Sequence, residues 1–362
     1  MTTNALVLYG SSSNNDIFYS SGFLCFDNFV FIQREKSKTI ITSGMEKGRA
    51  QKESKATSVY SVEEILGKRG KLEDALIRYI GQKLIWDISI PSDFPAGVAR
   101  RLKNKAFVKI KNPELGRECK TLDELAKIKD VQRAAESAMS VAKDMISHSL
   151  IGCENVLYYN SMALTSEWVK REISLEFARN GCYSDHESIV ICGDSCLDVH
   201  NTGRGALKAN ESIIIDIFPR SCTTRYFSDM TRTFVKGKAP KALLGMYKIV
   251  KRMKQYSWLN MKPGVNFYDM FSDCMEAFEG NGYKTYVLDG VRQGFIHGLG
   301  HGVGLDIHES PHGNEVLKAG NVVAVEPGLY YRGIGGVRLE DIVHVLPNGC
   351  ENLTVFPEEL EL

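Results

Sequence analysis

The sequence predicts a protein of two domains, a smaller α/β domain over residues 1–115 and a larger α+β domain over residues 121–362. The chain has 362 residues, which is more than one small hydrophobic core usually needs. Short β-rich runs alternate with helical runs in the first third, whereas long amphipathic helices and short strands follow. Residues 111–120 are charged, contain Pro and Gly, and are the predicted linker.

The composition excludes several classes of partner. Hydrophobic residues make up 43% of the chain and charged residues 25%, which is typical of globular proteins. Because 45 Lys and Arg nearly balance 44 Asp and Glu, no excess of basic charge favours nucleic acid or an anionic membrane. No run approaches the ~18 apolar residues of a membrane span, and residues 1–16 lack the basic start of a signal peptide. Nine scattered cysteines are typical of reduced thiols, so we expect a cytoplasmic protein without nucleic-acid or membrane partners.

The secondary structure follows from periodicity. In the first domain, β-branched and aromatic residues predict strands and amphipathic runs predict helices: strands at 29–32, 39–42 and 107–110, helices at 61–67 and 71–82. In the second domain, Thr121 and Glu124 have the spacing of a capping box before a long helix with apolar residues at helical intervals. The same patterns predict further elements: helices at 166–180 (ended by Gly181), 243–260 and 267–281, and strands at 188–192, 212–217, 321–325 and 343–346.

Two aspartates form the first candidate for chemistry. The apolar run before Asp216 predicts a strand that ends in a carboxylate, and Asp229 lies thirteen residues further, in a second alternating stretch. Each Asp alone is more often a surface or turn residue. If the two stretches form one hairpin, however, their carboxylates repel each other unless a divalent cation lies between them.

Three histidines form the second candidate. His297, His301 and His308 fall within twelve residues, although the chain has only eight histidines, and glycines separate them. Glycine allows the backbone to approach closely beside an imidazole ring. Such clustering favours a functional site over ordinary core histidines.

Two competing motifs in the same segment fail. The glycines do not match G-x-G-x-x-G, so a phosphate-binding loop is not predicted. Residues 308–312 read HESPH and match H-E-x-x-H, whose histidines bind zinc from one face of a helix. Pro311 lies inside that turn and Gly313 follows it, which is incompatible with a helix, so the zinc-protease interpretation is rejected.

Two glutamates complete the set. Glu326 follows the apolar run 322–325, and Glu340 shares a predicted strand face with Arg338 because the two alternate. Oxygen-rich coordination with one imidazole is typical of Mn²⁺, Co²⁺ or Zn²⁺ in a two-metal site with bridging carboxylates. The predicted metal ligands are Asp216, Asp229, His301, Glu326 and Glu340.

The order Asp, Asp, Gly-His-Gly, Glu-Pro-Gly and Arg-x-Glu-Asp resembles the pita-bread metallopeptidases, which include aminopeptidase P, prolidase and methionine aminopeptidase. The resemblance covers residues 121–362. Residues 1–115 are similar to the N-terminal domain of creatinase and prolidase, on residues 16–23 and 46–50. That domain and the spacing of the three histidines resemble the proline-specific branch.

The resemblance implies a pita-bread catalytic domain preceded by a creatinase-type α/β domain. It also implies a homodimeric, dinuclear metallopeptidase that hydrolyses Xaa-Pro bonds at the N-terminus of peptides, as aminopeptidase P does, or in dipeptides, as prolidase does. Two divalent ions are expected, Mn²⁺ first with Co²⁺ and Zn²⁺ as alternatives, and the attacking group is a hydroxide that bridges them. A metal-independent or non-catalytic protein of the creatinase fold is the alternative.

The resemblance also implies residue roles. Glu326 acts as general base besides binding metal, while His297 and His308 form hydrogen bonds to the scissile carbonyl and its tetrahedral intermediate. His200 lines the substrate pocket, and Arg338 orients the Glu340 side of the network.

The region between the two aspartates departs from the family pattern. Family members usually have Gly two residues after the first Asp, and the second Asp two residues closer. Here Phe218 and Pro219 follow, and we expect them to reshape the rim of the pocket. An insertion of two residues keeps both carboxylates on one face, because side chains alternate along a strand. His200 lies one residue closer to Asp216 than in the family pattern.

Overall fold

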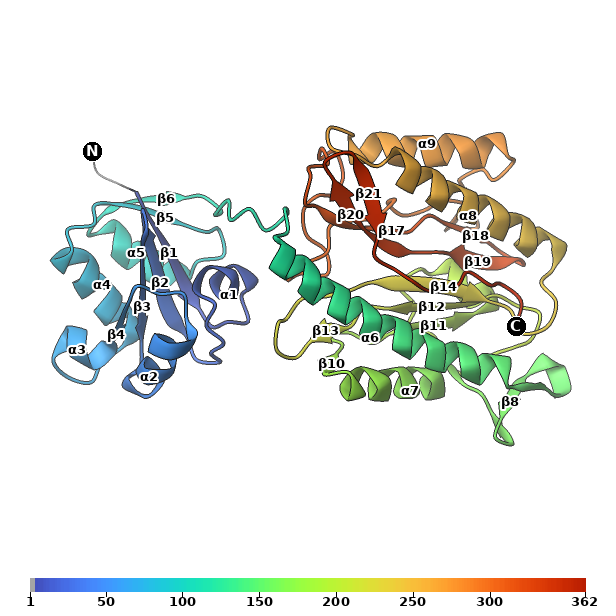
Figure 1. The fold of residues 1–362 in the computed structure, drawn as a ribbon, viewed down its shortest axis with the longest axis horizontal. Coiled ribbons are helices and arrows are strands. Elements are labelled where there is room, and N and C mark those ends of the chain that lie inside the picture. Colours follow the sequence, from blue (N-terminus) through green and yellow to red (C-terminus); the bar gives the residue numbers. More distant parts are fainter. Residues whose placement is uncertain (1–3) are drawn as a thin grey trace. The chain divides into compact units, whose positions relative to one another are not determined.

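A computed structural model describes residues 4–362 (Figure 1). The chain divides into two compact units, Met1–Gly116 and Arg117–Leu362. None of the described helices is long and apolar enough to cross a membrane.

The first unit is built on one mixed sheet of six strands in the order β4-β3-β2-β1-β5-β6. Its strands are β1 Ala5–Gly10, β2 Phe29–Arg34, β3 Ser37–Thr42, β4 Ser58–Ser61, β5 Asp87–Ile90 and β6 Phe107–Ile110, and its helices are α1 Asn15–Ser21, α2 Gly44–Glu53, α3 Val62–Leu66, α4 Leu72–Gln82 and α5 Ala96–Lys103. Alternate residues of β2 enter two separate apolar cores, Val30 and Ile32 on one face, Phe29 and Phe31 on the other. Both faces of the sheet are therefore covered, and the predicted α/β class is confirmed.

The predicted strands and helices of this unit are all present, but six elements were not predicted: β1, β4, β5, α1, α2 and α5. The helix α2 shows why. Only Ala50 is buried among its ten residues, so its sequence carries no apolar stripe.

The second unit places its strands between two pairs of helices (Figure 1). The helices are α6 Leu122–Ser147, α7 Ser166–Arg179, α8 Lys241–Asn260 and α9 Phe267–Gly280. The strands are β7 Leu150–Ile151, β8 Leu157–Tyr159, β9 Met162–Ala163, β10 Cys182–Tyr183, β11 Ile189–Cys192, β12 Ile213–Ile217, β13 Arg220–Ser221, β14 Met230–Phe234, β15 Tyr286–Leu288, β16 Val291–Gln293, β17 Val322–Val325, β18 Gly328–Tyr331, β19 Gly335–Arg338, β20 Asp341–Leu346 and β21 Gly349–Asn352. One core joins α6 and α7 to β12 and β14, and another joins α8 and α9 to β17–β20.

Alternation along β12 turns its polar end away from the helices. Ile213, Ile215 and Ile217 belong to the core of α6 and α7, so Asp216 faces the opposite side of the sheet. Strand β14 pairs antiparallel with β12, and Asp216 lies opposite Thr231. By the same alternation, Asp229 lies on the face of Thr231 and therefore on that of Asp216.

Local signals in this unit are confirmed. Thr121 and Glu124 form the predicted capping box at the start of α6. Helix α7 ends at Arg179, and Gly181 adopts a left-handed φ of 66° just after it. The nine cysteines form no disulfide among the described residues.

Candidate metal centre

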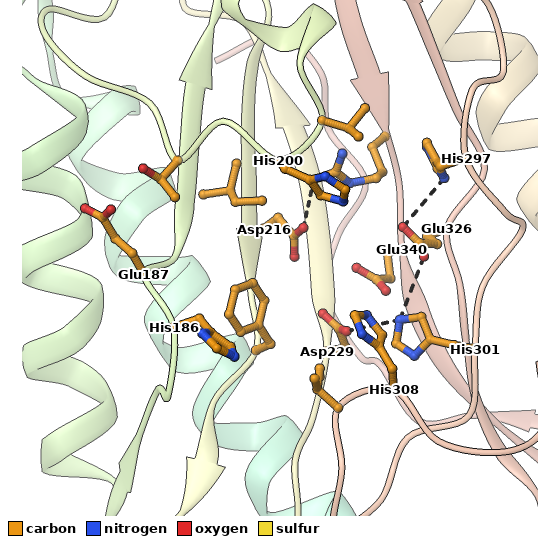
Figure 2. Close-up of a pocket in the computed structure, with 16 residues that line it drawn as sticks. His186, Glu187, His200, Asp216, Asp229, His297, His301, His308, Glu326 and Glu340 are labelled. Carbon is orange, nitrogen blue, oxygen red and sulfur yellow. Dashed lines mark hydrogen bonds and ion pairs between the residues drawn. The ribbon is translucent and has the colours of Figure 1, made fainter.

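One cavity of about 450 Å³ in the second unit brings the predicted site residues together (Figure 2). It is lined by all nine of them: His200, Asp216, Asp229, His297, His301, His308, Glu326, Arg338 and Glu340. These residues are spread along the chain from His200 to Glu340, and the fold brings them together.

Each of the four acids lies at the end of a strand or directly next to one. Asp216 lies within β12 and Asp229 directly before β14, which confirms that the two aspartates come from paired strands. Glu326 follows β17, and Glu340 lies in the break between β19 and β20.

The glycine-rich segment runs beside β17 and holds His301 against the acids. The backbone of Ala324 donates to the carbonyl of His301 at 2.8 Å, and that of Glu326 donates to Leu299 at 2.8 Å. A Cβ at Gly300 would lie 1.9 Å from the carbonyl oxygen of Ala324. Only glycine therefore allows this approach, as the sequence pattern predicted.

His301 offers a free lone pair to the carboxylates. Its Nδ1 lies 3.1 Å from the carbonyl oxygen of Gly302, which only accepts, so Nδ1 carries the proton. Nε2 then lies 3.6 Å from Asp229 and 3.8 Å from Glu326 without a proton between them. One ligand atom each of Asp229, His301 and Glu340 fall within 4.8 Å of one another. A divalent cation among these lone pairs would offset their mutual repulsion.

The crowding of acids shifts their pKa values upward. Burial, followed by the charges of Glu340 and Asp216, raises the pKa of Asp229 well above its usual range. Burial and the nearby carboxylates do the same to the pKa of Glu340, and burial raises the pKa of Glu326 to about 8. Burial lowers the pKa of His301 to about 3, so its imidazole is in the neutral form that binds metals.

The donor set fits divalent cations. Asp216 Oδ1 and Asp229 Oδ1 are buried without a hydrogen-bond partner among the described residues, so their desolvation is not offset by protein donors. Carboxylate oxygens with one imidazole nitrogen are the ligands that Mn²⁺, Co²⁺ and Zn²⁺ accept. The compact group of three could hold one ion, and Asp216 and Glu326 border it in the same cavity.

Arg338 connects the two sides of the site. It donates to Asp216 Oδ2 at 2.7 Å and to the hydroxyl of Tyr330 at 2.9 Å. The resemblance assigned Arg338 to the Glu340 side, but it reaches Glu340 only through Thr231, whose hydroxyl donates to Glu340 at 2.7 Å.

His297 is held on both nitrogens by the protein. Nδ1 donates to the carbonyl of Gly298 at 2.8 Å, so Nε2 accepts from the hydroxyl of Tyr330 at 2.9 Å. Burial lowers the pKa of His297 to about 3, which keeps this neutral tautomer. The single N–H of this tautomer is therefore bonded to the protein and is not left to donate to a substrate.

His308 lies over His301, with ring centroids 4.2 Å apart and planes nearly perpendicular. Both rings face the acids in Figure 2. The HESPH stretch forms no helix, and His312 is exposed and does not line the cavity. Glu309 is instead paired with Lys120 at 2.5 Å and Arg117 at 2.7 Å. The rejection of a zinc-protease helix is therefore confirmed.

Several cavity residues were missed from the sequence: His186, Glu187, Ile189, Val199, Thr202 and Ile307. His186 and Glu187 lie apart from the acids, at the left of Figure 2. Phe218 also lines the cavity, as its place after Asp216 suggested. Tyr330 was missed as well, because a tyrosine in an apolar strand has the pattern of a core residue.

The comparisons with known proteins agree with this geometry. The profile of metallopeptidase family M24 matches residues 126–347. An uncharacterized peptidase of Staphylococcus aureus is 30% identical over 245 residues, which are 66% of this chain but only 63% of that protein's length. A Xaa-Pro dipeptidase of Pyrococcus horikoshii is 28% identical over 284 residues, 76% of this chain and 75% of that protein.

The crystal structure of an X-Pro aminopeptidase from Thermotoga maritima superposes with a TM-score of 0.83 at 22% sequence identity. The superposition covers 99% of this chain and 98% of that one. It confirms the fold that the resemblance implied for both parts of the chain.

Proposed function

This chain belongs to metallopeptidase family M24, and on that premise we propose that it hydrolyses Xaa-Pro peptide bonds with two divalent metal ions. The observation that supports the proposal most is the convergence of the five proposed metal ligands in one cavity, where two buried carboxylate oxygens lack donors among the described residues. A metal-independent protein would leave the desolvation of these two oxygens without compensation.

The residues that would hold the ions are Asp216, Asp229, His301, Glu326 and Glu340. When bound, two such ions lower the pKa of water toward neutrality and polarise a carbonyl group. We propose Mn²⁺ as the first candidate, with Co²⁺ and Zn²⁺ as alternatives, because the donors are mainly carboxylate oxygens. We also propose a homodimer in the cytoplasm, on the basis of the resemblance and the unbridged cysteines.

The proton has to travel from the attacking water to the leaving nitrogen. An amide nitrogen leaves as a neutral amine, so the proline nitrogen has to be protonated before the C–N bond breaks. We assign to Glu326 the role of taking the proton and passing it on, because its carboxyl group lies in the same cavity as Asp229, His301 and Glu340. Arg338 meanwhile offsets the charge of Asp216 through their 2.7 Å contact.

His308 is the better candidate to stabilise the oxyanion. It lies beside His301 at the edge of the acid cluster, whereas both nitrogens of His297 are engaged by the protein. A donor aimed at the developing oxyanion stabilises the transition state more than the substrate. His297 then fixes Tyr330 and, through it, Arg338. His200 would contribute to the opposite wall of the substrate pocket.

The rest of the cavity suits a small, partly apolar substrate. Ile189, Val199, Phe218 and Ile307 provide apolar surface in which a pyrrolidine ring can be buried. The volume of about 450 Å³ is within the usual range for small-molecule sites.

Substrate cleavage tests the function directly. We expect the protein to hydrolyse an Xaa-Pro dipeptide, an Xaa-Pro-Yaa tripeptide, or both, in the presence of Mn²⁺, Co²⁺ or Zn²⁺. A chelator should abolish the activity and the returned metal should restore it. The ratio of the two rates would separate dipeptidase from aminopeptidase specificity, and absence of cleavage with all three metals would refute the proposal.

The two histidines of HESPH form a matched pair of variants. We expect His308→Ala to lower kcat on an Xaa-Pro peptide by ~100-fold or more, as loss of one oxyanion donor does. His312→Ala should leave kcat within about twofold, because its side chain is exposed and outside the cavity. Equal losses in the two variants would argue against the assigned role of His308.

A further inference from the structure

The connection between β12 and β14, residues 218–229, is folded rather than a plain hairpin loop. Its strand β13 pairs with β10, where Arg220 lies opposite Tyr183. The connection also folds back on itself. The backbone N–H of Ser221 donates to the carbonyl of Tyr226 at 3.0 Å, and the backbones of Arg220 and Phe227 form an isolated antiparallel β-bridge. The residues that lengthen this region relative to the family pattern therefore form a small structured unit.

Contacts to two other elements fix the connection in place. The hydroxyl of Tyr226 donates to Glu124 of α6 at 2.7 Å, and Ser228 donates to Gln132 of the same helix. The backbone of Phe227 donates to the carbonyl of Gly304 at 2.7 Å. The connection thus lies between α6 and the segment that carries His308.

Arg220 is the centre of this arrangement. Its side chain is 8% exposed, and its three nitrogens donate to three different segments. Nε donates to the carbonyl of Arg225 at 3.0 Å within the connection, one terminal nitrogen to Asp185 at 2.9 Å, and the other to the carbonyl of Leu305 at 3.4 Å. A planar guanidinium has three nitrogens that can donate to three separate acceptors, whereas the single ammonium group of lysine cannot reproduce this geometry.

Each of these segments supplies a wall of the cavity. Asp185 directly precedes His186 and Glu187, and Leu305 lies three residues before His308. Phe218 lies two residues before Arg220 itself. His186 and His308 stand on different sides of the space shown in Figure 2. One buried side chain is therefore bonded to all three segments.

We infer that Arg220 is a positioning residue that fixes His308, Phe218 and the His186–Glu187 wall relative to the strands that carry the acids. The inference rests on the proposed function of the cavity and adds to it a residue that does not touch the reacting atoms. Asp216 lies within β12, Asp229 directly precedes β14 and Glu326 directly follows β17, and the pairing of these strands does not involve Arg220. Loss of Arg220 should therefore affect catalysis more than metal binding.

The size of the effect follows from the tolerance of catalysis to misplacement. Without the guanidinium, the carbonyl of Leu305 loses the hydrogen bond from Arg220, and the segment that leads to His308 is less constrained. A displacement of about 1 Å of a catalytic group lowers a rate on the order of a hundredfold.

The experiment compares Arg220→Met and Arg220→Lys with Arg179→Met, which removes the ion pair of an exposed arginine to Glu176 and does not alter a residue that lines the cavity. For each variant, kcat and KM on an Xaa-Pro peptide, Mn²⁺ affinity and amide hydrogen exchange of residues 184–187 and 304–309 are measured. We expect Arg220→Met to lower kcat by about a hundredfold, to leave Mn²⁺ affinity within about twofold, and to speed exchange in both segments. Arg220→Lys, which can keep the contact to Asp185, should fall between, and Arg179→Met should match the wild type.

If Arg220→Met does not fold, Asp185→Ala carries the test, because it removes one of the three acceptors of Arg220 at a partly exposed position. Unchanged kcat and exchange in the folded variants would overturn the inference. So would a loss of activity fully explained by lost Mn²⁺. A wild type that cleaves no Xaa-Pro peptide would refute the proposed function instead, and the exchange measurement would still decide the role of Arg220.

Discussion

Replacing Asp229 or Glu340 with alanine is expected to abolish both metal binding and Xaa-Pro hydrolysis. Both side chains are buried, at 4% and 2% exposed, and each contributes one of the three atoms of the compact metal-binding group. Removing either leaves two, and the several kcal/mol that a bound ion gives the transition state correspond to a rate loss on the order of a thousandfold or more. Metal content per chain and kcat, both after chelation and return of the metal, measure the effect.

Asp289→Ala is the matched control, because Asp289 is exposed and only pairs with Arg332 at the surface. It should retain metal and activity. The metal-free Asp229→Ala protein should be at least as stable as the metal-free wild type, since it loses a carboxylate whose burial beside other acids is unfavourable. Full activity in either ligand variant after metal return would remove the basis for the assigned site.

Asp341→Ala should destabilise the fold more than any other single change considered. Asp341 is 1% exposed and pairs with Arg232 at 2.9 Å and Lys254 at 2.5 Å, both of which are buried as well. Alanine would leave two buried cations with fewer partners, which lowers the free energy of unfolding by about 3–5 kcal/mol. Urea unfolding of the metal-free protein, compared with the metal-free wild type, gives this difference without the contribution of bound ions.

Asp123→Ala provides the comparison for a surface ion pair. Asp123 pairs with Lys127 one helical turn away and is 77% exposed, so its loss should change the free energy of unfolding by ~0.5 kcal/mol or less. Adding Lys254→Met to Asp341→Ala should recover part of the loss, because it removes one of the two buried cations that Asp341 neutralises, while Glu358 keeps its pair with Lys251. A loss below about 1 kcal/mol for Asp341→Ala would mean that Arg232 and Lys254 find other partners or water.

The acids of the proposed metal site could be predicted because the strands beside them are short and buried. An apolar run that ends in Asp216 or is followed by Glu326 marks the point where a strand meets a polar cavity, and this pattern is local in sequence. The glycines beside His301 were informative for the same reason. Where two backbones lie in close contact, glycine is required, and these glycines can be recognised in the sequence.

Features that depend on partners distant in sequence could not be predicted in this way. Arg338 and Glu340 alternate and were expected on one strand, but the strand ends at Arg338. The backbone N–H of Glu340 instead donates to the carbonyl of Thr231, a residue of β14, at 3.0 Å. The fold of residues 218–229 likewise cannot be predicted from that stretch of sequence alone. It depends on contacts with Asp185 and Leu305, which are distant along the chain.

The contact between Gly300 and β17 has a consequence for how this site can change over generations. Because any Cβ at position 300 meets the carbonyl of Ala324 at 1.9 Å, no codon change to another residue leaves His301 in place beside Glu326. We therefore expect related proteins that keep a histidine in the place of His301, beside a strand like β17, to keep glycine immediately before it.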